Sequence, residues 1–424
     1  MKILLNSYSG YGAWFLLRFI QEGHDVSYHF IDSEHDEGKL VLAGIVPEFS
    51  TKEPIYKNYD LSIFDLTGKP KEAEKSMLET PTIGDGDFNS EIEDDRLLGI
   101  EVMEQCDINV PAYEEFNDIN EAKRFIRKTK KRYVFKPFGG QNQDTATTYV
   151  SRSDEDLIKY LDKLGSLSKG AEFILQEVVE GTEISTEAYF NGEEFYLVNA
   201  TLEEKKFMEG NKGPNTGCSG NLVWIYNPIN LPFIFREGLG KMKDFLHQYN
   251  YRGMIDLNTI VSDTKLYGLE WTPRFGYDAS ATLFNLISSN LGEFLGAVAS
   301  GAKPEYETNN MFASGIRLSI PPYPSEIVGK HPEGIPIQGL EDDECVKDCF
   351  LYDCYLSKFD ELCTAGINGF ICVPISSGNN IEDAFAKVYE KIKRIRIPDL
   401  QYRSDIGEIT RKRYNILSNQ GWLR

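Results

Sequence analysis

The sequence predicts a protein of mixed α/β class with several domains. Its first hundred residues alternate short apolar strands with helices, as a small parallel α/β domain does, whereas the chain from residue 310 onward is rich in short strands. A chain of 424 residues exceeds what one hydrophobic core usually organises, and its 41% hydrophobic residues can fill more than one. We therefore expect two to four domains or subdomains.

Charge and composition argue against several classes of partner. The formal net charge of −21 argues against general binding of nucleic acid or anionic membrane, because such partners need clustered Lys and Arg. A local basic pocket for one small phosphate remains compatible with it. The sequence has no run of about 18 apolar residues and no signal-peptide pattern, so we expect a cytoplasmic protein. The seven cysteines form no CxxC pair and are expected to be reduced, mostly buried thiols.

The N-terminal region predicts a strand, a turn and a helix. Residues 1–6 favour a strand, residues 7–12 a glycine-containing turn, and residues 13–23 an apolar helix. Further strands are expected at 24–32 and 60–66. A glycine turn between a first strand and a helix is where α/β domains bind anions or nucleotides. The spacing does not give GxGxxG, so a plain tight turn fits equally well.

A lysine beside a glycine pair is the first candidate for phosphate binding. Helices expected at 94–105 and 119–131 precede a strand that ends near Lys136, and Gly139 and Gly140 follow in a polar loop. The ammonium group and exposed backbone N–H groups of the loop can together hold phosphate oxygens. A hairpin turn with a solvated lysine is the simpler alternative.

A break between two strands is the candidate adenosine contact. The apolar run that ends at Val179 turns at Glu180 and Gly181 and resumes at Glu183. Backbone groups exposed at such a break can pair with an adenine edge, and a Glu can accept from ribose hydroxyls. An ordinary hairpin with surface acids fits the same pattern. Residues 209–220 contain four glycines and a proline, so we expect a functional loop with little regular structure.

Residues 253–278 carry carboxylates in an apolar, strand-forming background. Two strands joined by a polar turn at 262–265 place Asp256 on the first and Glu270 on the second. Because side chains two apart in a strand point the same way, Asp256, Glu270 and the Thr272 hydroxyl can share one face. Such oxygen ligands suit Mg²⁺, which takes one or two carboxylates and completes its shell with water and phosphates. A surface hairpin with solvated acids is an equal alternative.

The C-terminal region, from residue 310 onward, reads as a separate β-rich module. Strands are expected at 313–324, 348–356 and 367–375, and an amphipathic helix at 381–395. No internal repeat or low-complexity segment is evident.

Taken in order, these segments resemble the ATP-grasp superfamily, and within it the phosphoribosylamine–glycine ligase family of purine synthesis. The most specific match is KKFMEGNKGPNTGCSG, which resembles that family's KR-x-x-DGD-x-GPNTGGMG loop. LEWTPRFG is similar to its LEFNxRFGDPE, and YPSEIVGKHPEGIPIQGL and YRSDIG resemble its last domain. The resemblance implies an ATP-grasp fold with these parts: an N-terminal α/β domain at 1–92, an ATP-grasp region at 93–309 with a lid subdomain at about 118–187, and a β-rich domain at 310–424.

The resemblance also implies how ATP is held. Lys136 would contact the phosphates and take part in catalysis, and Glu183 would hold the ribose. Gln176, Glu177 and Val179 would line the adenine pocket. Arg96 would also contact the nucleotide, although the family has a lysine at this position.

A second set of residues is implied for the metal and the acyl phosphate. Glu270 matches the family's metal-ligating Glu, whereas Thr272 stands where the family has a ligating Asn. Asp256 has no acidic counterpart there but matches the first metal acid of the D-alanine ligase branch. The implied cofactors are ATP and Mg²⁺, with Mn²⁺ as the alternative metal. Arg274 would steady the acyl phosphate.

The implied reaction joins two small molecules. A carboxylate such as glycine would attack the γ-phosphate of ATP to give an acyl phosphate, and an amine would then displace phosphate. A lid loop at 139–145 would exclude water. We expect a monomer or homodimer. The residues implied to bind substrate are Gly10, Asn215, Thr216, Gly217 and Arg274.

Four departures from the family pattern lie on the substrate side. The first turn, NSYSGYGAW, lacks the Arg and His of the family's GxGGREHA, and Tyr277-Asp278-Ala279 replaces Asp-Pro-Glu. GCSG replaces GGMG, and TAGINGFICV lacks the arginine of GGRV. Together they predict that the amine is not phosphoribosylamine. The alternatives are a ligase for another amine, such as a modified nucleotide, and a nucleotide-binding relative without catalysis.

Overall fold

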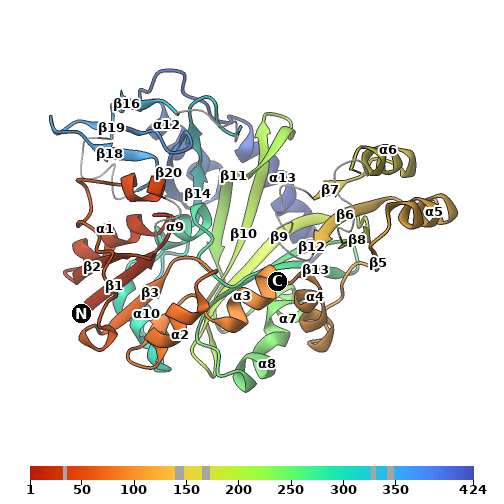
Figure 1. Ribbon diagram of the computed structural model, residues 1–424, viewed down its shortest axis with the longest axis horizontal. Coiled ribbons are helices and arrows are strands. Elements are labelled where there is room, and N and C mark those ends of the chain that lie inside the picture. The colour runs from red at the N-terminus through yellow and green to blue at the C-terminus, as the bar shows by residue number, and fades with distance from the viewer. Residues whose placement is uncertain (32–35, 139–147, 165–171, 326–330, 341–347) are drawn as a thin grey trace.

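The computed structural model describes residues 1–31, 36–138, 148–164, 172–325, 331–340 and 348–424 (Figure 1). The N-terminal region contains a parallel sheet in the order β2-β1-β3-β4, with helices packed against it. Helix α1 ends where Gly23 adopts a φ of 83°, which favours glycine. Its elements are β1 (Lys2–Ser7), α1 (Ala13–Gln21), β2 (Asp25–Phe30), η1 (Asp36–Leu40), η2 (Tyr56–Asn58), β3 (Leu61–Phe64), α2 (Pro70–Met77), β4 (Thr82–Ile83) and α3 (Asp87–Asp94).

A lid region projects from one side of the molecule (Figure 1). Its antiparallel sheet runs β5-β8-β6-β7, and it has a small core of its own, which includes Ile126, Leu161 and Phe173. Helix α4 (Arg96–Gln105) precedes it and is capped by the carboxylate of Asp95. The lid elements are β5 (Tyr113–Phe116), α5 (Ile119–Thr129), β6 (Tyr133–Phe138), β7 (Tyr149–Val150), α6 (Asp154–Leu164) and β8 (Glu172–Glu177).

The centre of the molecule is one long sheet in the order β13-β12-β9-β10-β11-β14-β20-β15, with β17 paired to β20. The strands alternate apolar residues, which enter the main core, with polar residues, which face the cavity described below. The central elements are β9 (Thr182–Phe190), β10 (Phe195–Met208), β11 (Lys212–Ile225), α7 (Phe233–Glu237), η5 (Leu239–Met242), α8 (Lys243–Gln248), β12 (Gly253–Val261), β13 (Leu266–Thr272), α9 (Asp278–Phe284) and α10 (Leu291–Ser300).

The C-terminal strands continue the central sheet, because β14 pairs with β11 and β20 pairs with β14. A small sheet, β16-β19-β18, lies beyond it. The domain limits drawn from the sequence remain a prediction. The remaining elements are β14 (Phe312–Ile316), β15 (Leu318–Ser319), β16 (Glu333–Pro336), β17 (Cys349–Leu351), β18 (Cys354–Leu356), β19 (Leu362–Ala365), β20 (Phe370–Gly378), α12 (Ile381–Ile392) and α13 (Ile406–Asn419).

The expectation of an irregular loop at 209–220 is wrong. Strand β11 begins at Lys212 and pairs with β10 as a long hairpin. The ladder accommodates the glycines through register shifts between Glu204 and Lys206 and between Lys206 and Met208, and Gly213 has a φ of 78°. The glycines of this segment therefore do not prevent it from forming a strand.

Two expectations about the whole chain can be compared with the structure. The cysteines within the described ranges, Cys106, Cys218, Cys349, Cys354, Cys363 and Cys372, are free and buried, as predicted. Cys345 lies outside those ranges. In the same ranges no helix combines the length and apolarity that crossing a bilayer requires.

Candidate functional site

A cavity of about 1940 Å³ lies where the lid, the central sheet and the N- and C-terminal regions meet. Residues from all four regions line it, and most of the side chains predicted from the sequence are among them. These are Arg96, Lys136, Gln176, Glu177, Val179, Glu183, Asn215, Thr216, Gly217, Asp256, Glu270, Thr272 and Arg274.

Gly10 is the predicted residue that the structure places elsewhere. It is buried with a φ of 80°, and a Cβ at this position would lie 2.6 Å from the carbonyl oxygen of Gly38 and 2.8 Å from Cγ2 of Val41. Glycine is therefore needed for the close approach of these segments. Its neighbour Tyr11 lines the cavity instead.

Two cations lie at the lid end of the cavity. Lys136 on β6 is buried, and Nε of Arg96, the first residue of α4, donates to the carbonyl oxygen of Pro137 at 3.3 Å. Burial, reinforced by the neighbouring Arg96, lowers the pKa of Lys136 to about 8. Burying cations is costly unless an anion compensates them, so both groups suit phosphate oxygens. The lid loop predicted at 139–145 lies outside the described residues.

The predicted adenine contacts lie where β8 leaves the lid. Gln176 is buried, and its Nε2 donates to the carbonyl oxygen of Pro111 at 3.4 Å. The N–H of Glu177 donates to the carbonyl oxygen of Ala112 at 2.7 Å, and its carboxylate pairs with Lys131. The Glu177 side chain is therefore held by the lid.

A network of two carboxylates, one ammonium and one amide crosses the floor of the cavity. Nζ of Lys205 lies 2.8 Å from Oε1 of Glu183 and 3.8 Å from Oε1 of Glu270. Nδ2 of Asn258 donates to the same two oxygens at 2.9 and 3.2 Å. Although burial opposes ionisation, Lys205 and the Asn258 hydrogen bond hold the pKa of Glu183 at about 2. Burial opposes ionisation of Glu270 as well, but Lys205 and Lys136 lower its pKa, so both carboxylates are ionised at neutral pH.

Strand register explains why these groups share a face. Asn258 pairs with Glu270 across β12 and β13, and Asp256 pairs with Thr272. On the other side of β12, Asp256 is opposite Glu187 of β9. All five residues line the cavity.

Three further carboxyl groups line the cavity beside this network, those of Glu187, which is buried, and of Glu203 and Asp256, which are half-buried. Burial raises the pKa of Glu187 and of Glu203 to about 7, and burial with both neighbours raises the pKa of Asp256 well above its usual value. Such groups would ionise more readily beside a cation. Among the described residues no three His, Cys, Asp or Glu side chains group as a metal site. Asp256 and Glu270 nevertheless fit Mg²⁺, which needs only one or two protein carboxylates when phosphates are present.

Arg413 of helix α13 contacts the strands that carry Glu183 and Lys205. Nη1 of Arg413 donates to Oε1 of Glu204 at 2.6 Å and to the carbonyl oxygen of Glu203 at 2.7 Å, and its Nη2 donates to the carbonyl oxygen of Glu183. The C-terminal region therefore fixes the two strands that carry Glu183 and Lys205.

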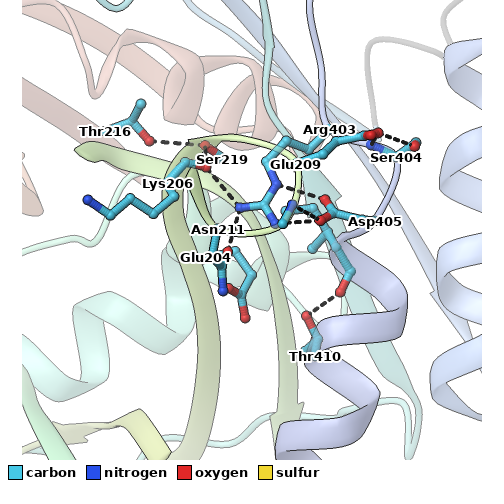
Figure 2. Close-up of polar contacts among 12 residues, drawn as sticks. Glu204, Lys206, Glu209, Asn211, Thr216, Ser219, Arg403, Ser404, Asp405 and Thr410 are labelled. Carbon is cyan, nitrogen blue, oxygen red and sulfur yellow. Dashed lines mark hydrogen bonds and ion pairs between the residues drawn. The ribbon is translucent and has the colours of Figure 1, made fainter. Parts of the chain in front are cut away.

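A second arginine joins the C-terminal region to the tip of the β10–β11 hairpin (Figure 2). Arg403 is 2% exposed and pairs with both oxygens of Asp405 at 2.8 and 3.0 Å. Its Nη1 donates to the carbonyl oxygen of Lys206 and to Oδ1 of Asn211, each at 2.9 Å. The N–H of Gly210 donates to Asp405 at 2.7 Å. This clamp holds the hairpin that carries Asn215, Thr216 and Gly217.

The far end of the cavity carries Arg274. Its Nε lies 2.9 Å from Oε1 of Glu93, and its guanidinium lies 5.0 Å from the centre of the Tyr277 ring. Although burial opposes it, the neighbouring Tyr277 and Glu93 raise the pKa of Arg274 above its usual value, so the group stays charged. Arg317 and Asp278 also line this end.

Sequence reasoning missed several of these residues. Asn258 could have been found, because it stands two positions after Asp256 on the same strand. Lys205 is the first residue of the recognised KKFMEG motif. Arg317 and Arg413 gave no local signal, since neither belongs to a motif and each reaches the cavity only through the tertiary fold.

Comparison with known proteins finds relatives in sequence that include phosphoribosylamine–glycine ligases. Residues 98–278 match the family model described as phosphoribosylglycinamide synthetase, ATP-grasp (A) domain. Phosphoribosylamine–glycine ligase from Halalkalibacterium halodurans is 26% identical over 330 residues, which cover 75% of this chain and 74% of that protein. The protein of the same name from Streptococcus pyogenes serotype M3 is 24% identical over 408 residues, covering 92% and 86%.

Solved structures share the fold. The crystal structure of phosphoribosylamine–glycine ligase from Thermotoga maritima superposes with a TM-score of 0.72 at 20% identity, over 96% of this chain and 100% of that chain. Biotin carboxylase from Campylobacter jejuni, crystallised with a β-γ-ATP ligand, gives a TM-score of 0.65 at 12% identity, over 99% and 96%. These likenesses establish the multi-domain ATP-grasp fold.

Proposed function

We propose that this chain, as a diverged member of the phosphoribosylamine–glycine ligase family of ATP-grasp enzymes, joins a carboxylate to an amine in its cavity with cleavage of ATP to ADP and phosphate. One observation carries the proposal: Lys136, Glu270 and Arg274 line the same cavity. They supply a phosphate-binding cation, a carboxylate for a metal and a guanidinium for an anionic intermediate, in the order that acyl-phosphate chemistry needs.

The nucleotide would lie between the lid and the central sheet. Its adenine would contact the segment from Gln176 to Val179, and Glu183 would accept hydrogen bonds from the ribose. Lys136 and Arg96 would hold the phosphates, because both are cations at the lid end, Lys136 buried and Arg96 half-buried. Asp256 and Glu270, with Thr272 beside them, would hold Mg²⁺ or Mn²⁺. The metal would neutralise phosphate charge during transfer.

The chemistry follows from the poor electrophilicity of a carboxylate. One oxygen of the substrate carboxylate attacks the γ-phosphorus of ATP and ADP leaves, which produces an acyl phosphate. The amine then attacks the acyl carbon, phosphate leaves, and the amine nitrogen loses a proton. Arg274 would stabilise the acyl phosphate by charge, and Asn215, Thr216 and Gly217 would border the substrate. Glycine is the carboxylate in the names of the relatives and is the first substrate to test.

A small-molecule ligase of this kind is expected to work in the cytoplasm, as a monomer or homodimer. It acts on free metabolites and needs no membrane or nucleic-acid partner.

Hydroxylamine trapping tests the proposal without knowledge of the amine. The protein is incubated with MgATP, hydroxylamine and a panel of carboxylates that begins with glycine. We expect carboxylate-dependent release of ADP together with the matching acyl hydroxamate, because hydroxylamine can replace the amine. The reaction without a carboxylate is the control. ATP binding without hydroxamate from any carboxylate would contradict the proposed ligation.

A further inference from the structure

The turn before α1 holds a carboxylate of the protein itself. The N–H of Gly12 and the hydroxyl of Ser7 both donate to Oδ2 of Asp65 at 2.6 Å, and the N–H of Gly10 donates to Ser7 Oγ at 2.9 Å. Asp65 is 2% exposed. A helix N-terminus after a glycine turn attracts an anion. Here Asp65 occupies that position.

The space around this carboxylate is closed. A Cβ at Gly12 would come 2.5 Å from Cβ of Asp65, which shows how closely the two segments approach. The N–H groups of Ala13 and Phe15 donate to the carbonyl oxygens of Gly10 and Gly12, at 3.1 and 2.9 Å. The N–H groups of Gly12, Ala13 and Phe15 thus donate within the protein, and a phosphate group at this turn would have to displace Asp65.

A stack of aromatic rings continues from the turn across the far end of the cavity. The Tyr11 ring lies between those of Tyr277 and Tyr352, with both centres 4.2 Å away. Tyr352 stacks on Phe370 at 5.4 Å. Tyr11 and Tyr277 line the cavity. The rings come from the N-terminal, central and C-terminal regions, so this end of the cavity has an aromatic wall where the three meet.

An arginine lies at each end of the stack, and each is paired with a carboxylate. Arg274 lies over Tyr277 and pairs with Glu93 at 2.8 Å. Arg317 lies 4.0 Å from the centre of the Phe370 ring, and its Nε and Nη2 donate to the two oxygens of Asp278 at 3.0 and 2.7 Å.

The charges around the stack favour a cation over a phosphate. Asp65, Glu93 and Asp278 supply three carboxylates, against the two guanidinium groups of Arg274 and Arg317. Burial raises the pKa of Asp65 to about 6, so it is still mostly ionised at neutral pH. A substrate phosphate placed at the turn before α1 would meet the carboxylate of Asp65 at short range, because Glu93 and Asp278 already balance Arg274 and Arg317.

We propose that the acceptor of this ligase is a phosphate-free amine, cationic before it reacts, with an apolar or flat body that packs against Tyr11 and Tyr277. It is thus not the phosphorylated sugar amine in the name of the relatives. The inference rests on the proposed ligase function. The carboxylates attract the ammonium form, and the aromatic wall accommodates the body of the molecule.

A binding experiment tests the exclusion of phosphate directly. Ribose 5-phosphate is titrated calorimetrically into the full chain saturated with Mg²⁺ and ADP, and ribose serves as the matched phosphate-free control. We expect no saturable heat with a Kd below about 1 mM for ribose 5-phosphate. Tighter saturable binding that ribose does not show would overturn the inference, whatever the outcome of any activity assay.

A turnover experiment tests the amine class and separates the two proposals. With the carboxylate that yields a hydroxamate, ADP release is compared for phosphoribosylamine, ribosylamine, benzylamine and tyramine. We expect kcat/KM for an aromatic amine to exceed that for phosphoribosylamine at least tenfold. Phosphoribosylamine as the best of the four would reject the inference while hydroxamate formation still upheld the ligase. Loss of the hydroxamate itself would reject the ligase.

Discussion

Glu270 is the residue on which the proposed metal site depends most. Its carboxylate is ionised, lies 3.8 Å from Lys205 and accepts from Asn258. Replacing it by Gln keeps the size and the hydrogen bond but removes the charge. We expect Glu270→Gln to lower kcat in the hydroxamate assay at least about a hundredfold, equivalent to about 2.7 kcal/mol of transition-state stabilisation. The circular dichroism spectrum should not change.

Asp263→Asn is the matched control, because Asp263 is exposed in the turn of the same hairpin, where it accepts from Gln420 at 2.6 Å. It should retain full activity. Near-normal turnover of Glu270→Gln would show that Glu270 is not a metal ligand.

The lowered pKa of Lys136 predicts that kcat/KM for ATP falls at alkaline pH. Burial lowers its pKa to about 8, so the free protein loses this positive charge as the pH rises through that value. Below pH 8 the ammonium can hold phosphate, and above it the affinity should fall. We expect kcat/KM for ATP to decline with an apparent pKa of about 8, measured as ADP release from pH 6 to 10.

Lys136→Arg supplies the comparison, since a guanidinium stays charged throughout this range. Its profile should lack the alkaline decline near pH 8, even if its activity is lower. An unchanged decline would assign the titration to another group.

At the scale of residues, the sequence predicted which side chains lie together where chemistry and local pattern coincide, and their roles stay predictions. Lys136, Asp256 and Glu270 stand in strands whose alternation could be read, and the structure brings all three to one cavity. The position of Arg317 at the cavity could not be predicted, because it depends on contacts with Asp278 and Phe370, which are distant in sequence. Gly10 lies in the predicted glycine turn and has a positive φ, but glycine is needed there because Gly38 and Val41 pack closely against it.

At the scale of elements, α13 acts as a brace for β9 and β10. Arg413 and Glu204 form a buried ion pair, with side chains 19% and 4% exposed, and the pair lies at 2.6 Å. Removing the arginine would leave a buried carboxylate without its partner. We expect Arg413→Gln to lower the free energy of unfolding by about 3 kcal/mol, measured by urea denaturation.

Arg411→Gln is the control on the same helix, since Arg411 is 47% exposed and lies 3.5 Å from Glu382. It should cost less than about 1 kcal/mol. Equal effects of the two variants would show that Arg413 acts only through general helix stability.

Element-level prediction depended on which interaction decides the structure. Helices α1, α4 and α5 were predicted because apolar runs and helical periodicity are local signals, and α4 and α5 also carry side-chain caps, from Asp95 and Asp118. The sequence did not predict the strand at the hairpin tip, residues 209–220. That strand is stabilised by pairing with β10 and by Arg403, which is distant in sequence. Tertiary partners thus overrode glycine content there.

At the scale of the molecule, the shared sheet makes the C-terminal region part of the core. Strand β14 covers β11, with Trp224 opposite Phe312, and Trp224 also packs on Tyr414. A chain of residues 1–309 would expose β11 as a long unpaired edge. We expect it to be insoluble on expression, as judged by the soluble fraction after lysis.

Removal of the lid is the matched comparison. Ala112 and Glu177 are joined by a hydrogen bond of 2.7 Å, so a short Gly-Ser linker can replace residues 113–176. The lid has its own core, and this deletion should leave a soluble, folded protein that no longer binds ATP. A soluble, cooperatively folding 1–309 would instead support independent domains.

The separate core of the lid also predicts how the molecule moves. The lid core is small, whereas β10 and β12 belong to the main core. We expect amides of β6 and β8 to exchange hydrogen at least about tenfold faster than those of β10 and β12, and MgATP to slow them selectively. Equal exchange in both regions, or protection that is uniform on nucleotide binding, would show that the lid does not open by itself.

The brace from Arg413 to the carbonyl oxygen of Glu183 spans 230 residues of sequence. During synthesis at about 5–20 residues per second, a ribosome needs about 10 to 50 seconds to add that length. Throughout this interval the strands that carry Glu183 and Lys205 exist without the arginine that fixes them. The growing chain is therefore expected not to cleave ATP until residues near 413 have emerged from the ribosome. The order of translation thus prevents an incomplete chain from being active.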